Sequence, residues 1–298
     1  MGKMILGTVQ LGMPYGVNNV SGQPDLQEAV DILDYAYQNG VSILDTASSY
    51  GDSEKIIGAY IKQNTTKSPF KICTKLPVDI GEMVISEYYE ESRQNLHIDT
   101  FYVYYLHRFD QCKNLDVLQQ LDRLKEIGQI RNIGVSVYQP DELGYIVERL
   151  SDRIDVVQIP FNMMDNVRWT RNGLLEEAAK KGIKIYARSI FLQGLILSDE
   201  KSDLCRKMGI VDQIAQLKKI AHNRKRQLAQ LAVDFVNTID EIDHWLVGCE
   251  TVGQLEENIQ LCKNAKRLER DVCEEIEKVS NSVDEKVIDP RKWNVKKN

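Results

Sequence analysis

The chain repeats a pattern in which an amphipathic segment is followed by a glycine and then by a short apolar run. Apolar residues in the amphipathic segments recur three and four positions apart, which is the spacing of one helix face. The glycine supplies a left-handed residue that ends a helix, and an apolar run with little alternation is typical of a strand buried on both faces. The pattern occurs at residues 29–47, 117–136 and 174–189. It predicts three helices that each lead into a buried strand.

Five further apolar runs, at residues 4–10, 71–76, 101–107, 155–160 and 244–249, complete a set of eight predicted strands. A candidate helix follows each strand. Parallel strands joined by right-handed helical crossovers close into a barrel. An open doubly wound sheet would carry a glycine-rich phosphate loop after its first strand, but residues 7–16 read GTVQLGMPYG and contain no G-x-G-x-x-G. We therefore predict an α/β fold, a single-domain (β/α)8 TIM barrel.

The length of 298 residues suits one such domain, because barrels of this kind run to roughly 250 residues. We assign residues 1–280 to the barrel and residues 281–298 to a C-terminal tail. The tail either extends freely or docks Ile288 and Trp293 near the barrel mouth. An irregular stretch from about residue 191 to residue 208 is a candidate substrate loop or disordered flap.

The composition argues against several classes of protein. A formal net charge of −6 and a pI near 5.4 disfavour nucleic-acid binding. No apolar run approaches the roughly 20 residues that span a bilayer, and the N-terminus lacks the features of a signal peptide. The six cysteines include no C-x-x-C pair and the four histidines lie far apart. We expect a cytoplasmic protein with reduced thiols, no metal site, and neither nucleic acid nor membrane as a partner.

Candidate catalytic residues lie at or just beyond the ends of three successive predicted strands. They are Asp45 and Tyr50 after the second strand, Lys75 at the end of the third and His107 at the end of the fourth. Because the active site of a barrel lies at the carboxyl ends of its strands, all four side chains are expected at one mouth.

These residue types suit proton delivery. A tyrosine has an ordinary pKa near 10, but a Lys75 ammonium beside Tyr50 would lower that pKa, and Asp45 would hold the ammonium in place. His107 would hydrogen-bond a substrate oxygen and orient it. The set predicts reduction of a carbonyl by hydride, with Tyr50 donating the proton as alkoxide charge develops. Each residue alone has a structural explanation, such as a helix N-cap or a solvated side chain, and only the joint arrangement favours catalysis.

The chain resembles the aldo-keto reductase family over nearly its whole length. The resemblance rests on LGTVQLG at residues 6–12, D-T-A-x-x-Y-G at 45–51, T-K-L at 74–76, Y-L-H at 105–107, I-G-V-S at 133–136 and L-E-E-N at 255–258. It implies that the four candidates are catalytic, with Tyr50 as acid or base, and that NAD(P)(H) binds across the barrel mouth. The residues implied for the cofactor are Thr8, Ser136, Gln158, Arg188, Ser189, Leu192, Gln193, Gly194, Gly248, Cys249, Glu250, Gln254, Glu257 and Asn258.

The resemblance assigns Ser136 and Gln158 to the nicotinamide carboxamide. The family usually has Asn after that Ser, and Val137 stands there in this chain. One hydrogen bond to the carboxamide is therefore missing or comes from another group, such as Asn162.

Arg188 stands where many family members place a Tyr that stacks on the nicotinamide. Its charge would favour the reduced cofactor over the cationic oxidised form. The alternative is that Tyr186 or Phe191 takes the stacking role. The next residues, 189–195, match the loop that cradles the pyrophosphate through backbone N–H groups, with Ile190 in place of the family's Pro.

At the adenosine end, members that prefer NADP(H) carry basic or hydroxyl residues against the 2′-phosphate. The matching positions here are Gly248, Cys249 and Glu250, and Gln254 stands where Arg is common. A carboxylate near a phosphate is electrostatically unfavourable, so we expect NAD(H) or dual use rather than strict NADP(H). The alternative is that Glu250 points to solvent and a basic residue from elsewhere, such as Lys201, reaches the phosphate.

The leading hypothesis is an NAD(P)H-dependent oxidoreductase that reduces a small aldehyde, ketone or sugar-like substrate. A cofactor-binding regulatory or scaffold protein with little turnover is the alternative, because fold does not fix function. A barrel isomerase or aldolase with Lys75 as a Schiff base ranks third, since it leaves the other three candidates without a role. Substrate identity and oligomeric state stay open, although the family's barrels often work as monomers.

Overall fold

The structure is a computed structural model that describes residues 3–19, 21–64, 70–81 and 84–293. Eight parallel strands pair in chain order and close into a barrel, with β8 against β1. The strands are β1 (Met4–Gly7), β2 (Ile43–Asp45), β3 (Lys71–Lys75), β4 (Val103–Leu106), β5 (Ile133–Ser136), β6 (Val156–Pro160), β7 (Lys184–Arg188) and β8 (Ile242–Gly248). Each overlaps a predicted strand, and the closed sheet confirms the predicted (β/α)8 barrel.

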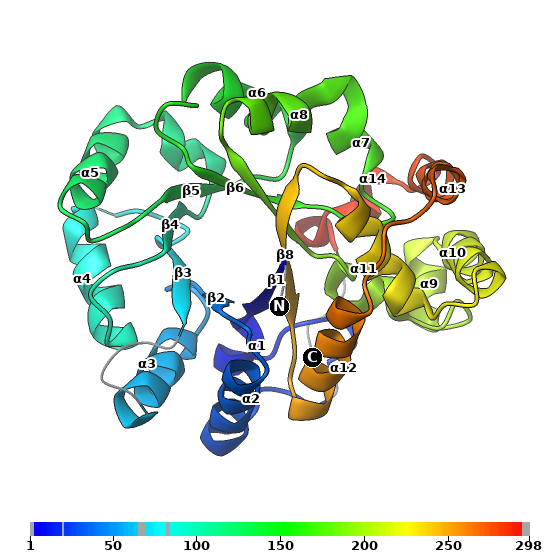
Figure 1. Ribbon diagram of the computed structural model, residues 1–298, viewed down its shortest axis with the longest axis horizontal. Helices are drawn as coiled ribbons and strands as arrows, with labels where there is room; N and C mark the ends of the chain where they lie inside the picture. The colour runs from blue at the N-terminus through cyan, green and yellow to red at the C-terminus, as the bar shows by residue number, and fades with distance from the viewer. Residues whose placement is uncertain (1–2, 20, 65–69, 82–83, 294–298) are drawn as a thin grey trace.

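Helices surround the barrel (Figure 1). The α-helices are α1 (Val9–Gly12), α2 (Leu26–Gln38), α3 (Ser53–Asn64), α4 (Ile85–Leu96), α5 (Leu115–Glu126), α6 (Pro140–Arg149), α7 (Val167–Thr170), α8 (Leu174–Lys180), α9 (Asp203–Met208), α10 (Val211–Asn223), α11 (Leu228–Thr238), α12 (Val252–Lys263), α13 (Arg270–Ser280) and α14 (Glu285–Ile288). Short 3₁₀ turns are η1 (Phe109–Lys113), η2 (Arg171–Gly173), η3 (Leu192–Leu197) and η4 (Pro290–Lys292). None of the helices in the described ranges is long and apolar enough to cross a bilayer.

Local sequence signals explain where the predicted helices begin and end. α2 begins at a capping box, in which the Asp25 side chain accepts from the Glu28 N–H and the Glu28 carboxylate accepts from the Asp25 N–H. Gly40, Gly128 and Gly182 follow α2, α5 and α8 with φ of +76°, +78° and +81°. Glycine adopts this left-handed conformation without the steric penalty of a Cβ. The predicted helix–glycine–strand pattern is therefore confirmed.

Alternation along the strands directs chemical groups into the barrel mouth. Successive side chains of a strand point to opposite faces, and the barrel interior is filled by an apolar cluster that includes Ile43 and Cys73. Two positions further along the same strands lie Asp45 and Lys75, which are also buried. His107 continues the interior face of β4 in the same way. The alternation along the strands thus places Asp45, Lys75 and His107 at the mouth, above the apolar side chains that fill the barrel interior.

The C-terminal segment docks on the barrel as far as the structure describes it. Val287 and Ile288 are buried in the main core, and the Trp293 indole N–H donates to the Val287 carbonyl at 2.9 Å. Arg291 lies over the Tyr138 ring, with 3.5 Å between its Cζ and the ring centre. The described residues of this segment are thus packed against the barrel, and residues 294–298 of the predicted tail lie outside the described part.

Candidate active site

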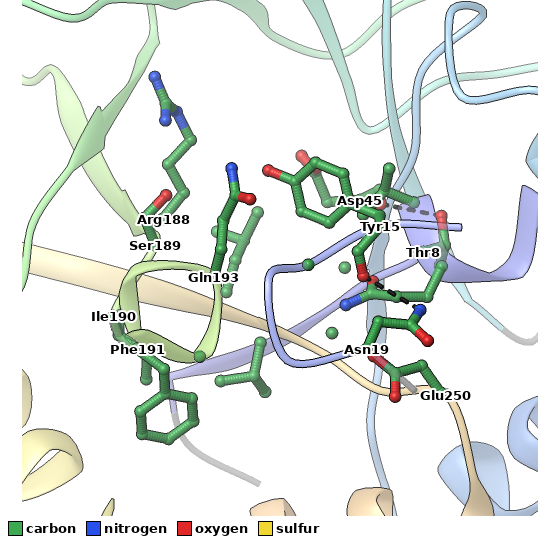
Figure 2. A pocket seen from close by; sticks show the side chains of 18 of the residues that line it. Thr8, Tyr15, Asn19, Asp45, Arg188, Ser189, Ile190, Phe191, Gln193 and Glu250 are labelled. Atoms are coloured by element: carbon green, nitrogen blue, oxygen red, sulfur yellow. Dashed lines mark hydrogen bonds between the residues drawn. The ribbon is translucent and has the colours of Figure 1, made fainter. Parts of the chain in front are cut away.

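A cavity of about 470 Å³ opens at the carboxyl ends of the strands. It is lined by all four predicted catalytic residues and by every predicted cofactor residue except Leu192 and Cys249. Small-molecule sites typically enclose about 300 to 1,000 Å³. Figure 2 shows part of the lining, in which Arg188 and Glu250 lie well apart. We call the part around Tyr50 and Lys75 the catalytic end and the part around Glu250 the far end.

Lys75 and Asp45 form a buried ion pair at the catalytic end. Lys75 Nζ lies 2.5 Å from Asp45 Oδ1 and donates to the Thr46 carbonyl at 2.8 Å. Gln158 donates to the other carboxylate oxygen at 2.9 Å. Burial on its own would lower the pKa of Lys75, but Asp45 and the neighbouring Tyr50 outweigh it and raise that pKa. Lys75 therefore stays charged and is held in one position.

Tyr50 lies beside this pair, with 4.8 Å between Lys75 Nζ and the centre of the Tyr50 ring. Burial is the largest influence on Tyr50 and raises its pKa, while Lys75 lowers it and Asp45 raises it again. Lys75 thus lowers the pKa of Tyr50 as predicted, but burial outweighs it and the net pKa lies above the ordinary value. Tyr50 is therefore a neutral phenol, and it lies beside an ammonium that would stabilise a tyrosinate.

His107 is fixed by a contact between its Nδ1 and the Leu76 carbonyl at 3.2 Å. A carbonyl oxygen only accepts, so this contact requires the proton on Nδ1. Burial and then the charge of Lys75 lower the pKa of His107 to about 4. The ring is therefore neutral near pH 7, with Nε2 as an acceptor. In this form the free His107 nitrogen can accept a hydrogen bond from a hydroxyl but cannot donate one to a carbonyl.

Two glycines that the sequence analysis did not single out hold the Tyr50 loop. A Cβ on Gly12 would lie 1.8 Å from the Tyr50 carbonyl oxygen, and one on Gly51 would lie 2.2 Å from the Gly12 carbonyl oxygen. Gly51 also has a φ of +55°. The backbones of α1 and the Tyr50 loop can approach this closely only because both positions lack a side chain. The close approach fixes where Tyr50 enters the cavity.

The expected carboxamide residues lie together at the ends of β5 and β6. Ser136 and Gln158 line the cavity and are paired in the β5–β6 register. Val137 is fully buried. Asn162 donates to the Ser189 carbonyl and accepts from the Met164 N–H. Since Asn162 is buried and does not line the cavity, the expectation that it replaces the missing carboxamide contact is wrong.

Arg188 lines the cavity at the end of β7, as the sequence places it. Its guanidinium lies over the Tyr138 ring, 4.1 Å from Cζ to the ring centre, and donates to the Val137 carbonyl at 3.2 Å. Tyr186 is buried in the barrel interior and does not line the cavity. Of the two aromatic alternatives for stacking, only Phe191 reaches the cavity.

The loop after β7 curves through several left-handed residues. Ser189, Leu192, Gln193 and Gly194 have φ of +60°, +49°, +55° and +89°. Such turns aim backbone N–H groups into a concavity that suits an anion. Leu192 departs from the expectation, because its side chain is fully buried in the core and its N–H donates to the Ser189 carbonyl at 2.8 Å. The curved backbone fits the expected pyrophosphate without Leu192.

The far end of the cavity is acidic. Glu250 and Glu257 line it together with Gln254 and Asn258, and Gln254 Nε2 donates to Glu250 at 3.2 Å. Glu250 is thus held at the cavity wall rather than pointing freely to solvent. Cys249 departs from the expectation because it is buried in the core and outside the cavity lining. Among the lining residues that the structure describes, the basic ones are Lys75 and Arg188, and Lys201 is absent from this set.

Further residues outside the predicted catalytic and cofactor sets also line the cavity. They are Val9, Gln10, Tyr15, Gly16, Asn18, Asn19, Tyr138, Ile190, Phe191, Leu197, Leu246 and Val247. Gln10 Oε1 is buried with no hydrogen-bond partner among the described residues, and it lies 2.2 Å from where a Cβ on Gly248 would be. An orphaned amide oxygen and a glycine that leaves room beside it fit a dinucleotide that supplies donors there. Its place at the end of the first predicted strand, within LGTVQLG, is the signal that could have pointed to Gln10.

The chain is similar to known proteins over almost its full length. A sequence model described as the Aldo/keto reductase family matches residues 3–281. The chain is 26% identical over 295 residues to an uncharacterized oxidoreductase, YqkF of Bacillus subtilis (strain 168), covering 90% of this chain and 93% of that protein. It is 22% identical over 298 residues to the L-glyceraldehyde 3-phosphate reductase of Escherichia coli (strain K12), covering 87% and 85%. The holo form of aldo-keto reductase AKR11C1 from Bacillus halodurans has the same fold, with a TM-score of 0.75, 19% identity and coverage of 96% and 95%.

Proposed function

This chain belongs to the aldo/keto reductase family and is an NAD(P)(H)-dependent oxidoreductase, and on that premise we propose that it reduces a small aldehyde, ketone or sugar-like substrate with Tyr50 as the proton donor. The observation that carries the proposal is the buried Lys75–Asp45 pair against the Tyr50 ring. A bound nicotinamide supplies the hydride for such a reduction. The protein supplies the proton and an environment in which the developing charge is stabilised.

Each catalytic side chain has a distinct task in this proposal. Tyr50 holds its proton until alkoxide charge develops on the substrate oxygen, because burial raises its pKa. Transfer of the proton leaves a tyrosinate, which the adjacent Lys75 ammonium stabilises. Asp45 keeps Lys75 charged and in place. The charges are positioned before the reaction, so little reorganisation is needed when the transition state forms.

His107 positions the substrate rather than donating a proton. With its proton on Nδ1, its Nε2 accepts from the hydroxyl of the alcohol, or from a hydroxyl next to the carbonyl in a sugar-like substrate. The ring stands edge-on to Tyr50, with 6.1 Å between ring centres and an angle of 85°. A hydroxyl oxygen between the two rings would accept from the Tyr50 phenol and donate to His107 Nε2, whereas a carbonyl oxygen there would accept from Tyr50 alone.

For the cofactor we propose NAD(H) or dual use. Glu250 and Glu257 line the far end, and the basic lining residues, Lys75 and Arg188, belong to the other part of the cavity. A 2′-phosphate there would be repelled by the carboxylates. Arg188 at the catalytic end would in turn favour the reduced, uncharged nicotinamide. Fluorescence titration with NADH, NADPH and their oxidised forms measures both preferences.

Tyr50→Phe tests the proposed function. The variant should lose at least about a hundredfold in kcat, the lower range for a general acid, while the dissociation constant for NADH stays within about twofold of the wild type. Tyr88→Phe is a matched control, because Tyr88 lies on α4 outside the cavity lining. Unchanged turnover in Tyr50→Phe would refute the assigned donor. Cofactor binding without turnover in the wild type would favour the regulatory alternative.

A further inference from the structure

Within the part of the chain that the structure describes, the cavity-lining Arg188 has no ion-pair partner. The Arg188 guanidinium donates one hydrogen bond, to the Val137 carbonyl at 3.2 Å. Among the described residues, no carboxylate oxygen lies within 4.0 Å of it. Its neighbours differ in this respect, since Lys75 is paired with Asp45 and Arg291 with Asp289. A partly buried charge without a partner is unfavourable unless a ligand supplies the opposite charge.

Arg188 is also held in place with most of its donors unused. One face of the guanidinium rests on the Tyr138 ring, and Arg291 of the docked C-terminal segment lies over the same ring. Stacking occupies the face of a guanidinium but leaves its N–H edge available. An arginine carries several N–H donors, and here the protein accepts from one of them. The group is preorganised for bidentate binding of a planar or tetrahedral oxyanion.

The position of Arg188 points to the substrate. Tyr138, on which it rests, follows β5 and lines the cavity near Ser136, at the catalytic end. Arg188 acts electrostatically on Tyr50 and His107, since its charge lowers the pKa of each. The far end around Glu250 lies well away from it in Figure 2. An anion at Arg188 would therefore lie closer to the catalytic end than to the adenosine end. The pyrophosphate expected at residues 189–195 is the competing anion, and the effect of Arg188→Met on NADH binding distinguishes it from the substrate.

We propose that the physiological substrate is an anionic carbonyl compound, whose carboxylate or phosphate group is bound by Arg188 while its carbonyl lies at Tyr50. This inference rests on the proposed carbonyl reduction and names the substrate class for it. The anionic group is unchanged by the reaction, because hydride and proton add only to the carbonyl carbon and oxygen. Arg188 is thus a specificity-determining residue.

Matched substrates test the proposal. The carboxylate arm compares 4-carboxybenzaldehyde with its uncharged methyl ester, and the phosphate arm compares glyceraldehyde 3-phosphate with glyceraldehyde. We expect kcat/KM of the wild type to favour the anionic member of at least one pair by about tenfold or more, the effect of a charge-assisted hydrogen bond. The arm with the larger ratio identifies the oxyanion. A ratio near one in both arms overturns the proposal.

Variants assign the preference to Arg188. Arg188→Met should bring the ratio of kcat/KM for the anionic substrate to that for the uncharged one close to one. Arg188→Lys should restore part of this ratio, because a lysine keeps the charge without the planar fork. Arg108→Met is the control for general electrostatic attraction, since Arg108 neighbours His107 but is paired with Asp79 and Asp110 outside the cavity lining. An equal loss in Arg108→Met would overturn the assignment. Thermal melting confirms that each variant is folded.

Three further outcomes separate this proposal from others. If Arg188→Met weakens NADH binding severalfold in a substrate-free titration and leaves the ratio unchanged, Arg188 serves the cofactor and the inference is wrong. If neutral aldehydes are reduced as efficiently as anionic ones, the inference fails while the proposed function stands. If no carbonyl compound is reduced and Tyr50→Phe matches the wild type, the proposed function fails and the inference fails with it.

Discussion

The two ends of the cavity are built in different ways. At the catalytic end Lys75 is 1% exposed, and it is ion-paired with Asp45 across neighbouring strands. At the far end Glu250 and Gln254 lie around the start of α12 and pair with each other near solvent. The first pair is part of the barrel itself, whereas the second is attached to its rim.

We expect this difference to separate the residues that carry out the reaction from the residues that select the cofactor. Removing one partner of a buried pair leaves an uncompensated charge and is expected to affect both stability and turnover. Changing a solvated carboxylate at the rim, such as Glu250, alters only a screened electrostatic interaction with the cofactor bound beside it. Substitutions at the two ends should therefore differ in size and in kind. The predictions below measure that difference, beginning with the largest effect.

Lys75→Met should have the largest effect. It removes the stabiliser of the Tyr50 anion, so kcat should fall by about a thousandfold, within the range for acid–base catalysis. It also leaves Asp45 buried without a cation, which costs about 3–5 kcal/mol of unfolding free energy. Kinetics and urea unfolding measure the two losses. Lys71→Met on the same strand is the control, because Lys71 is exposed at the start of β3.

The double variant Asp45→Asn with Lys75→Met separates the two losses. Neutralising both partners should recover most of the lost stability, because no unpaired charge remains buried, while turnover stays low. A Lys75→Met variant that kept kcat within tenfold of the wild type would contradict the view that the buried end carries the chemistry.

Gly12→Ala should come next, because it disturbs the catalytic end without changing a catalytic group. The new Cβ would lie 1.8 Å from the Tyr50 carbonyl oxygen, so the Tyr50 loop must shift. A displacement of about 1 Å can cost about a hundredfold in rate, and we expect a loss of that order in kcat. Gly144→Ala in α6 is the matched control, since nothing lies within 4 Å of a Cβ there. Equal kinetics for both variants would show that the glycine contact does not position Tyr50.

Strand-derived features of this molecule were predictable from the sequence, and loop-derived features were not. Period-two alternation fixes the directions of Asp45 and Lys75, so their place at the mouth follows from strand positions alone. The contact of Gly12 with Gly51 depends on α1 meeting the Tyr50 loop, which no local pattern encodes. The lowering of the Tyr50 pKa by Lys75 was predictable, but its net rise was not, because burial is a property of the assembled cavity and outweighs the lysine. Cys249 lies beside Glu250 in sequence, yet it points into the core.

His107 gives a pH-dependent test of moderate size. Its pKa is lowered to about 4 in the folded chain, against about 6.5 in an unfolded chain. Between these values the unfolded chain binds the extra proton, so stability should fall as the pH drops from about 6.5 to about 4. When solvent screening of the half-buried ring is allowed for, His107 accounts for about 2 kcal/mol of the unfolding free energy lost over this pH range. The His107→Gln variant should not lose this part of its stability. The measurement is the unfolding free energy of the wild type minus that of the variant at each pH. Parallel pH profiles for the two proteins would contradict the assigned shift.

Glu250→Lys should have the smallest effect, because it acts at the solvated end. Reversing this charge replaces repulsion of a 2′-phosphate by attraction, so the ratio of kcat/KM for NADPH to that for NADH should rise by about tenfold at low salt. The rise should shrink as added salt screens the charge, and kcat with NADH should stay near the wild-type value. Glu256→Lys is the control, because Glu256 lies on the same helix outside the cavity lining. If both variants change the ratio equally, net charge and not the far end sets cofactor preference. If Glu250→Lys instead lowers kcat by the same factor as Gly12→Ala, the two ends are not separable and the comparison fails.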